Sequence, residues 1–384
     1  MLQDISLPRV IGVKSEYQLL GDLSNIYASQ FLVDYPGQND YFAPPSPPHQ
    51  LPSESWLAIF REATWTPGAM EVDDYDAFTA YTRDEHGINL YARYREAMDT
   101  KLSLSLVSKR WRALATEFLY EYIVIKNGHH ACEIRDALEG SSVETLAGQR
   151  AYGSWTLRMD LALEDVHVWE DWHTAAMVGI LQNCPNLAVF STAFCTAEAY
   201  LFYPSTFLQA LAPLRDLKNL RRLELRGDVS FLNDLVSEVS ESTEVLWLLP
   251  PAKGSRRNES LSLCLPKLRV LKNNFIDESF TLDWHMPCLE SYLTDEIVHF
   301  HQHLQTHGVR LRCLGVPNIA FGPPAFPSCP HLLEVSLRFG GIPWYILTVP
   351  HRTSASKVSL STTGLTFRAR SRGTTTRTDP RFTA

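Results

Sequence analysis

Apolar residues recur with helical spacing along residues 102–125, which read LSLSLVSKRWRALATEFLYEYIVI. One set lies three or four positions apart and therefore shares a helix face: Leu104, Val107, Trp111, Leu114 and Phe118. Leu102 and Leu106 add a second apolar edge beside that face. A helix that is apolar on two sides needs two partners, so the pattern predicts one contact inside the local fold and another elsewhere. The last residues, YEYIVI, favour a strand.

A shorter amphipathic helix is predicted in residues 51–63, LPSESWLAIFREA. Pro52 suits a first helical turn because its missing N–H would have no helical partner there. The apolar face comprises Trp56, Ile59, Phe60 and Ala63, and the helix should end near Thr66-Pro67-Gly68. The residues that follow, to about Asn89, are expected to form an acidic surface loop. A further helix is expected to start near Leu90.

Between about Trp155 and Phe339 a short pattern returns eight times, with apolar positions two apart behind an apolar anchor, as in LKNLRRLEL and LPKLRVLKN. When the eight copies are aligned, the second apolar position is occupied by Leu157, Phe190, Leu223, Leu246, Leu271, Tyr292, Leu314 and Val335. Successive copies are 33, 33, 23, 25, 21, 22 and 21 residues apart. Spacings in the twenties around LxxLxL are typical of leucine-rich repeats, in which each repeat adds one strand to a curved parallel sheet. Helices are expected between the strands, over residues 173–182, 204–212, 231–239 and 295–305.

The chain therefore divides into four parts by pattern and composition. Residues 1–50 form an N-terminal extension ending in a linker, APPSPPHQ, whose four prolines in eight residues exclude helix and central strand. Residues 51–126 hold the helices, with an inserted loop at about 66–100, and residues 127–345 hold the repeats. Residues 346–384 are rich in Ser, Thr and Arg and are expected to be disordered. The predicted fold class is α+β or α/β.

Composition and charge narrow the range of functions that the chain can have. The chain has 384 residues, 45% hydrophobic, and a net charge of -8 without a basic stripe, which argues against nucleic acid as the main partner. No stretch approaches 18 apolar residues, so a membrane span is not expected. The seven cysteines are spread singly and no secretory signal is evident, so we expect reduced thiols in a cytoplasmic or nuclear protein.

The two helical segments together resemble a known family. LPSESWLAIFREA followed by TKLSLSLVSKRWRALATEFLY is similar to an F-box, and the TKL lead-in, the FLYE exit and the inserted loop resemble the F-box-like proteins of mushroom-forming fungi. The resemblance implies a three-helix F-box that docks on the Skp subunit of an SCF-type cullin ubiquitin ligase. The repeats would then hold the protein to be ubiquitinated, whose identity the sequence does not give.

The resemblance also implies which residues contact the Skp-type adaptor: Leu51, Pro52, Ile59, Phe60, Leu102, Leu106, Val107 and Trp111. Lys109 and Arg110 would lie on the rim of this contact, where charge steers association. The alternative is a non-catalytic leucine-rich-repeat scaffold, in which the same helices only cap the first repeat, as solenoids require.

Residues between the paired apolar strand positions are expected to point away from the core and to line a concave, target-binding face. The candidates are Arg158, Glu224, Arg226, Trp247, Lys272, Ser336 and Arg338. Trp and Arg are the types most often found at interaction hot spots. Their mixed chemistry does not define the target.

Catalysis and metal binding are not expected. The chain carries no GxSxG, phosphate-binding glycine loop or HExxH motif, so we predict neither an enzyme nor a cofactor. His299, His303 and His307 recur every four residues and would share a helix face, but no Cys or carboxylate joins them. With Ile297, Phe300 and Leu304 as the buried face, these histidines are expected to be solvated.

Overall fold

The computed structural model describes residues 51–72, 88–144, 150–163, 170–195, 209–227, 229–249, 262–274, 281–294, 300–317, 328–338 and 345–348. The predicted N-terminal extension, most of the acidic loop and the chain after residue 348 lie outside these ranges. Among the helices described, none combines the length and apolar character needed to cross a bilayer.

Three mutually packed helices follow the proline-rich stretch: α2 (Ser53–Thr64), α4 (Ile88–Val107) and α5 (Lys109–Glu121). The prediction of one continuous helix through Trp111 and Phe118 is wrong. The chain breaks at Ser108, whose backbone is extended and whose Oγ accepts a hydrogen bond from the N–H of Trp111 at 3.1 Å, which caps α5. We refer to α2, α4 and α5 as the helical unit.

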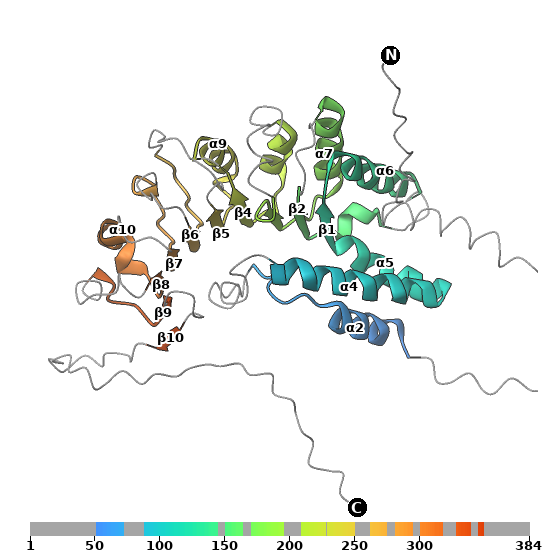
Figure 1. The fold of residues 1–384 in the computed structure, drawn as a ribbon, viewed down its shortest axis with the longest axis horizontal. Helices are drawn as coiled ribbons and strands as arrows, with labels where there is room; N and C mark the ends of the chain where they lie inside the picture. Colours follow the sequence, from blue (N-terminus) through green and yellow to red (C-terminus); the bar gives the residue numbers. More distant parts are fainter. Residues whose placement is uncertain are drawn as a thin grey trace, which may run out of the picture.

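In the part of the chain that the structure describes, ten strands form one open sheet in which spatial order follows chain order, so the fold is α/β. Strands β1 to β9 run parallel, and only β10 is antiparallel to its neighbour β9. The row of strands curves from one end to the other (Figure 1). The strands are β1 (Tyr122–Ile125), β2 (Arg158–Leu161), β3 (Val189–Ser191), β4 (Arg222–Arg226), β5 (Val245–Leu249), β6 (Val270–Asn273), β7 (Ser291–Thr294), β8 (Cys313–Pro317), β9 (Glu334–Arg338) and β10 (Tyr345–Thr348).

The strand register confirms seven of the eight aligned positions. One continuous row of paired residues crosses the sheet: Phe190, Leu223, Leu246, Leu271, Tyr292, Leu314 and Val335. In β2 the row passes through Met159 and not through Leu157, so the first aligned position is wrong by two residues. The row then continues to Ile123, which makes the predicted YEYIVI strand the first strand of this sheet.

Helices cover one face of the sheet, and the helical unit lies on the other. The connections between strands include α6 (Gly128–Glu144), η2 (Tyr152–Trp155), α7 (Asp171–Asn183), η4 (Ala212–Asp216), α9 (Val229–Val239), α10 (Phe300–His307) and η6 (Gly308–Arg310). In Figure 1, α6, α7 and α9 stand on one side of the strands, and α2 and α4 on the opposite side. We call the latter side the concave face. Helices α7 and α9 confirm two of the expected connections, and α10 confirms the described part of a third; residues 201–208 and 295–299 lie outside the description.

The apolar row and the connecting helices share one buried core that extends from β1 to β9. A second, smaller core lies within the helical unit and is formed by Phe60, Ala115 and Phe118. The two cores meet because α5 runs directly into β1, with Glu121 and Tyr122 adjacent in the chain. Strand β10 occupies residues 345–348, so the expected tail from residue 346 begins inside a strand.

Candidate functional site

The predicted adaptor-binding residues are divided by the structure into exposed and buried groups. Leu51, Ile59, Leu106 and Val107 have 43%, 45%, 52% and 61% of their surface exposed, and Pro52 is exposed beside them. Trp111 and Leu102 are half-buried. Phe60 is fully buried at the centre of the small helical core, which corrects the expectation that it faces a partner.

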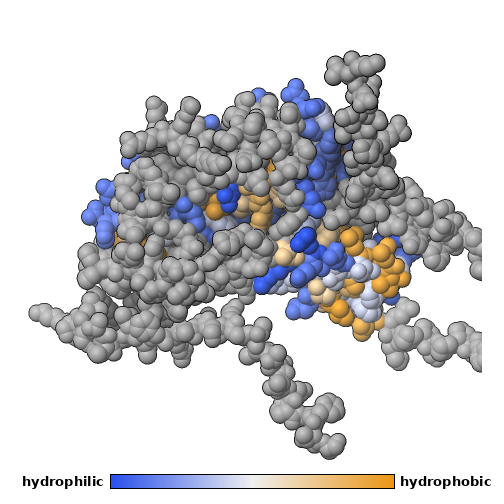
Figure 2. Space-filling view, in the orientation of Figure 1, coloured by the Kyte–Doolittle hydropathy of each residue, from blue (hydrophilic) through white to orange (hydrophobic). Residues whose placement is uncertain are grey.

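Exposed apolar side chains are concentrated on this part of the molecule. Within the described ranges, five of the seven large hydrophobic residues that remain exposed lie between residues 51 and 107. Figure 2 shows hydrophobic residues gathered on the surface where Figure 1 places the helical unit. Apolar patches of this kind mark protein-binding surfaces, because water disfavours them unless a partner covers them. We refer to Leu51, Ile59, Leu106 and Val107 as the apolar patch.

Aromatic packing behind the apolar patch fixes the helices relative to one another. The ring of Trp111 on α5 lies 4.7 Å from the ring of Trp56 and 4.9 Å from that of Phe60, both on α2. Arg110 was expected on the rim, and its guanidinium also holds α2 by donating to the carbonyl of Leu51 and to Ser53 Oγ, each at 3.3 Å. The patch is therefore presented by a packed support.

Two titratable groups of the helical unit influence each other: Lys101 on α4, which is buried, and Glu121 at the end of α5, which is half-buried. Burial lowers the pKa of Lys101 to about 8, although the nearby carboxylate of Glu121 opposes this shift. Burial raises the pKa of Glu121, and Lys101 opposes that shift in turn. Each charge therefore favours the ionised form of the other across α4 and α5.

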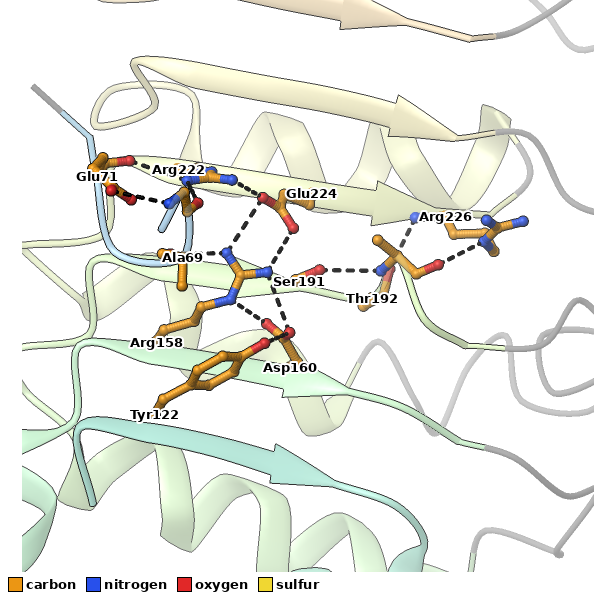
Figure 3. Close-up of polar contacts among 12 residues, drawn as sticks. Ala69, Glu71, Tyr122, Arg158, Asp160, Ser191, Thr192, Arg222, Glu224 and Arg226 are labelled. Atoms are coloured by element: carbon orange, nitrogen blue, oxygen red, sulfur yellow. Dashed lines mark hydrogen bonds and ion pairs between the residues drawn. The ribbon is translucent and has the colours of Figure 1, made fainter. Parts of the chain in front are cut away.

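The concave face carries a buried cluster of four charged residues from β2 and β4: Arg158, Asp160, Arg222 and Glu224 (Figure 3). Arg158 Nε lies 2.8 Å from Asp160 Oδ1, and its Nη2 donates to Glu224 Oε2 at 2.8 Å. Arg222 Nη2 donates to the other oxygen of Glu224. Strand β3 lies between the two pairs, and at the matching positions it carries only Val189 and Ser191. Because these side chains are short, Arg158 and Glu224 meet across a whole strand.

Arg158 and Glu224 were expected to be exposed on an open concave face, and that expectation is wrong. Both are fully buried and bind each other, so neither is available to a partner in this structure. They do lie on the predicted face, but a segment from earlier in the chain covers them. Arg158 Nη1 donates to the carbonyl of Ala69 at 3.0 Å, and Arg222 Nη1 donates to the carbonyl of Gly68 at 2.8 Å.

The two carboxylates of the cluster have opposite pKa shifts. Burial raises the pKa of Asp160 to about 6, against the attraction of Arg158. Burial also acts to raise the pKa of Glu224, but Arg158 and Arg222 together outweigh it and hold this pKa below its ordinary value. Glu224 is therefore the carboxylate on which the buried arginines depend, because it contacts both of them.

Three other predicted concave residues lie further along β4 to β6. The Nζ atom of Lys272 sits 3.3 Å from the centre of the Trp247 ring, a cation–π contact, and Trp247 donates to Asn274 Oδ1 at 3.1 Å. Arg226 is half-buried and donates through Nε to the carbonyl of Ala193 at 3.1 Å. Lys272 is buried, contrary to the expectation of exposure. The remaining candidates, Ser336 and Arg338, lie on β9, where side chains are outside the description.

The histidines of α10 correct a further expectation. His303 was expected to be solvated, but it is buried together with Phe300 and Leu304 and lies 2.9 Å from Thr281 Oγ1. Its imidazole also packs 5.0 Å from the ring of Tyr292. Within the described ranges, His, Cys, Asp and Glu side chains form no group of three suited to a metal ion.

Asp160 and Arg222 are not among the residues predicted to line the concave face. Their signal was present, because RMD and RLE each place opposite charges two residues apart, on the repeats that form β2 and β4. Such residues share a face of their strands and can compensate each other when buried.

Compared with known proteins, the chain matches no protein-family model and no curated protein sequence.

Proposed function

We propose that the protein is a substrate-receptor subunit of an SCF-type ubiquitin ligase, without catalytic activity of its own. The helical unit would dock on a Skp-type adaptor, and through it on a cullin, and the curved sheet would hold a target protein. The concentration of exposed apolar residues on the helical unit is the observation that carries the proposal. The resemblance of LPSESWLAIFREA and LVSKRW to a fungal F-box supports it.

Four of the eight adaptor-binding residues that the resemblance implies form the apolar patch, and Pro52 adjoins it. The buried Phe60 and the half-buried Trp111 serve this surface from behind, because they hold α2 against α5. A docking partner would thus meet aliphatic side chains, with the exposed Lys109 and Arg110 following Val107 closely in the chain, where charge would steer association.

The experiment is co-purification of the tagged full-length protein with a Skp-type adaptor and a cullin. Leu106→Asp should reduce recovery of both at least about tenfold, because a charge replaces an exposed side chain at the centre of the proposed contact. Val309→Asp is the matched control, since Val309 is 59% exposed on η6 and lies outside the helical unit. Undiminished recovery with Leu106→Asp would contradict the proposal.

A second candidate is a repeat scaffold whose helical unit only caps the solenoid. One observation favours it: α5 continues without a linker into β1, which pairs with β2. On this alternative, neither variant recovers an adaptor, and removal of the helical unit lowers the stability of the sheet without any loss of binding.

A further inference from the structure

Residues 66–72, TPGAMEV, leave α2 and cross to the concave face, and we call them the strap. The strap opens with a tight turn in which the N–H of Ala69 donates to the carbonyl of Thr66 at 3.1 Å. Gly68 has φ +82°, and Pro67 precedes it, as a type II turn requires. Ala69 and Val72 are then buried.

Arginines of the sheet hold the strap through its main-chain carbonyls. Besides the bonds to Gly68 and Ala69, Arg222 Nη1 donates to the carbonyl of Glu71 at 3.0 Å. Arg269, which immediately precedes β6, donates to the carbonyl of Val72 at 3.3 Å. The strap therefore spans the sheet from β2 to β6. Because the acceptors are main-chain atoms, this mode of binding recognises a turn-containing peptide with little dependence on its side chains.

The charged cluster beneath the strap is neutral by itself. Arg158 and Arg222 are paired with the carboxylates of Asp160 and Glu224. The strap offers their Nη1 atoms uncharged acceptors, the carbonyls of Ala69 and Gly68. The ion pairs do not depend on the strap, and another peptide could present the same carbonyls. An anionic ligand would gain little, because the arginine charge is already compensated.

We propose that the concave face between β2 and β6 is a binding surface for a turn-containing peptide, which the strap occupies in cis and which a partner peptide takes by displacing it. This inference concerns the sheet alone and does not depend on docking of the apolar patch to an adaptor. It places a partner's main chain, not a charged side chain, over Arg158 and Arg222.

Hydrogen exchange of the full-length protein provides the first test. If the strap is displaceable, its amides exchange by local opening at least about tenfold faster than the paired amides of β2 to β4. Equal exchange rates for strap and strands would show that the strap opens only with the sheet, and would overturn the proposal. This measurement uses the unaltered chain and does not depend on any variant folding.

Peptide binding provides the second test. A fluorescent peptide of residues 64–72 should bind a full-length variant whose residues 66–72 are replaced by Gly and Ser, and should bind the wild type at least about tenfold more weakly, since its own strap competes. In the replaced background, Arg269→Met should weaken the peptide about three- to tenfold through loss of one hydrogen bond. Arg215→Met is the control, because Arg215 is exposed on η4.

Absence of peptide binding to the folded strap-replaced variant would overturn the proposal, as would binding that Arg269→Met leaves unchanged. Adaptor recovery by the same variant separates the two ideas. Retained adaptor with no peptide binding contradicts the inference alone, and peptide binding without adaptor contradicts only the proposed function.

Discussion

Neutralising the two buried carboxylates of the concave face should have unequal effects on stability. Glu224→Gln and Asp160→Asn each replace a carboxylate by an amide of nearly the same shape, and both sites are fully buried. The two substitutions therefore differ mainly in the electrostatics of the site. Their opposite pKa shifts predict that only the first is costly.

The magnitudes follow from the partners of each group. Glu224 contacts both Arg158 and Arg222, and its low pKa means that the folded state favours its charge. Removing that charge leaves buried arginines undercompensated, which costs about 3–5 kcal/mol of unfolding free energy. Asp160 has a pKa of about 6, above its ordinary value of 3.8, so the folded state disfavours its charge. Asp160→Asn should remain within about 1.5 kcal/mol of wild type, since relief of desolvation offsets the weakened contacts to Arg158 and Tyr122.

Linkage gives the sign of the accompanying pH dependence. Between pH 3.8 and about 6 the folded state binds more protons at Asp160 than the unfolded state, so this residue contributes stability at low pH that is lost as the pH rises through 6. Asp160→Asn should remove this contribution. The pH dependence of the variant should then differ from wild type in that window.

Urea unfolding followed by tryptophan fluorescence at pH 7 measures these differences. Glu238→Gln is the control, because Glu238 pairs with Arg215 at 3.5 Å where both side chains are about half exposed. It should change stability by less than about 0.5 kcal/mol. The reasoning is refuted if Glu224→Gln lies within about 1 kcal/mol of wild type, or if Asp160→Asn costs as much as Glu224→Gln.

Three further predictions concern the helical unit and α6. Phe60→Ala should lower the unfolding free energy by about 3–5 kcal/mol, because Phe60 is fully buried. Ile59→Ala, at an exposed position, should lower it by less than about 1 kcal/mol in the same urea assay. Equal losses would contradict the assignment of Phe60 to the core and Ile59 to the surface. Ser108→Ala removes the α5 cap and should lower the unfolding free energy by about 1 kcal/mol, with Ser108→Asp retaining wild-type stability; an unaffected alanine variant would contradict the capping role. Burial lowers the pKa of His130 to about 4, and its Nδ1 accepts from the N–H of Lys126, so this residue should contribute a rise in stability of about 2–3 kcal/mol between pH 4 and 6.5, opposite in sign to the contribution of Asp160. His130→Gln should flatten that rise in acid titrations of the unfolding midpoint, and an unchanged slope would show that another group titrates.

The strand positions were predictable because alternation with a period of two fixes which side chains face the core. It fixed Leu223, Leu246 and Leu271 in one row, as the register confirms. It could not distinguish Leu157 from Met159, because a shift of two residues leaves the same side chains on the same face. The break at Ser108 had a local signal as well, a serine directly before a new helical turn, but the continuous apolar spacing across it pointed to one helix.

Exposure of the concave face was not predictable in the same way. The pattern correctly placed Arg158 and Glu224 away from the main core, but whether a face meets water depends on what else covers it. The covering carbonyl of Ala69 lies 89 residues before Arg158 in the chain, and the segment that carries it has no regular periodicity. Phe60 illustrates the same limit within one helix: it and Ile59 share the apolar edge of α2, and only the packing of Trp111 and Phe118 decides which of them is buried.

The helical unit is attached to the sheet at several places. At its C-terminal end α5 becomes β1, and at the end of α2 the strap crosses to β4 and β6 through Arg222 and Arg269. Side chains add further contacts, because Tyr94 and Met98 of α4 belong to the main buried core and the Tyr94 ring lies 4.6 Å from the ring of Tyr122 on β1. Displacement of the strap by a partner peptide would therefore remove one restraint and leave these core contacts in place. The apolar patch should then keep its orientation relative to the sheet, because buried packing and not the strap alone holds α4.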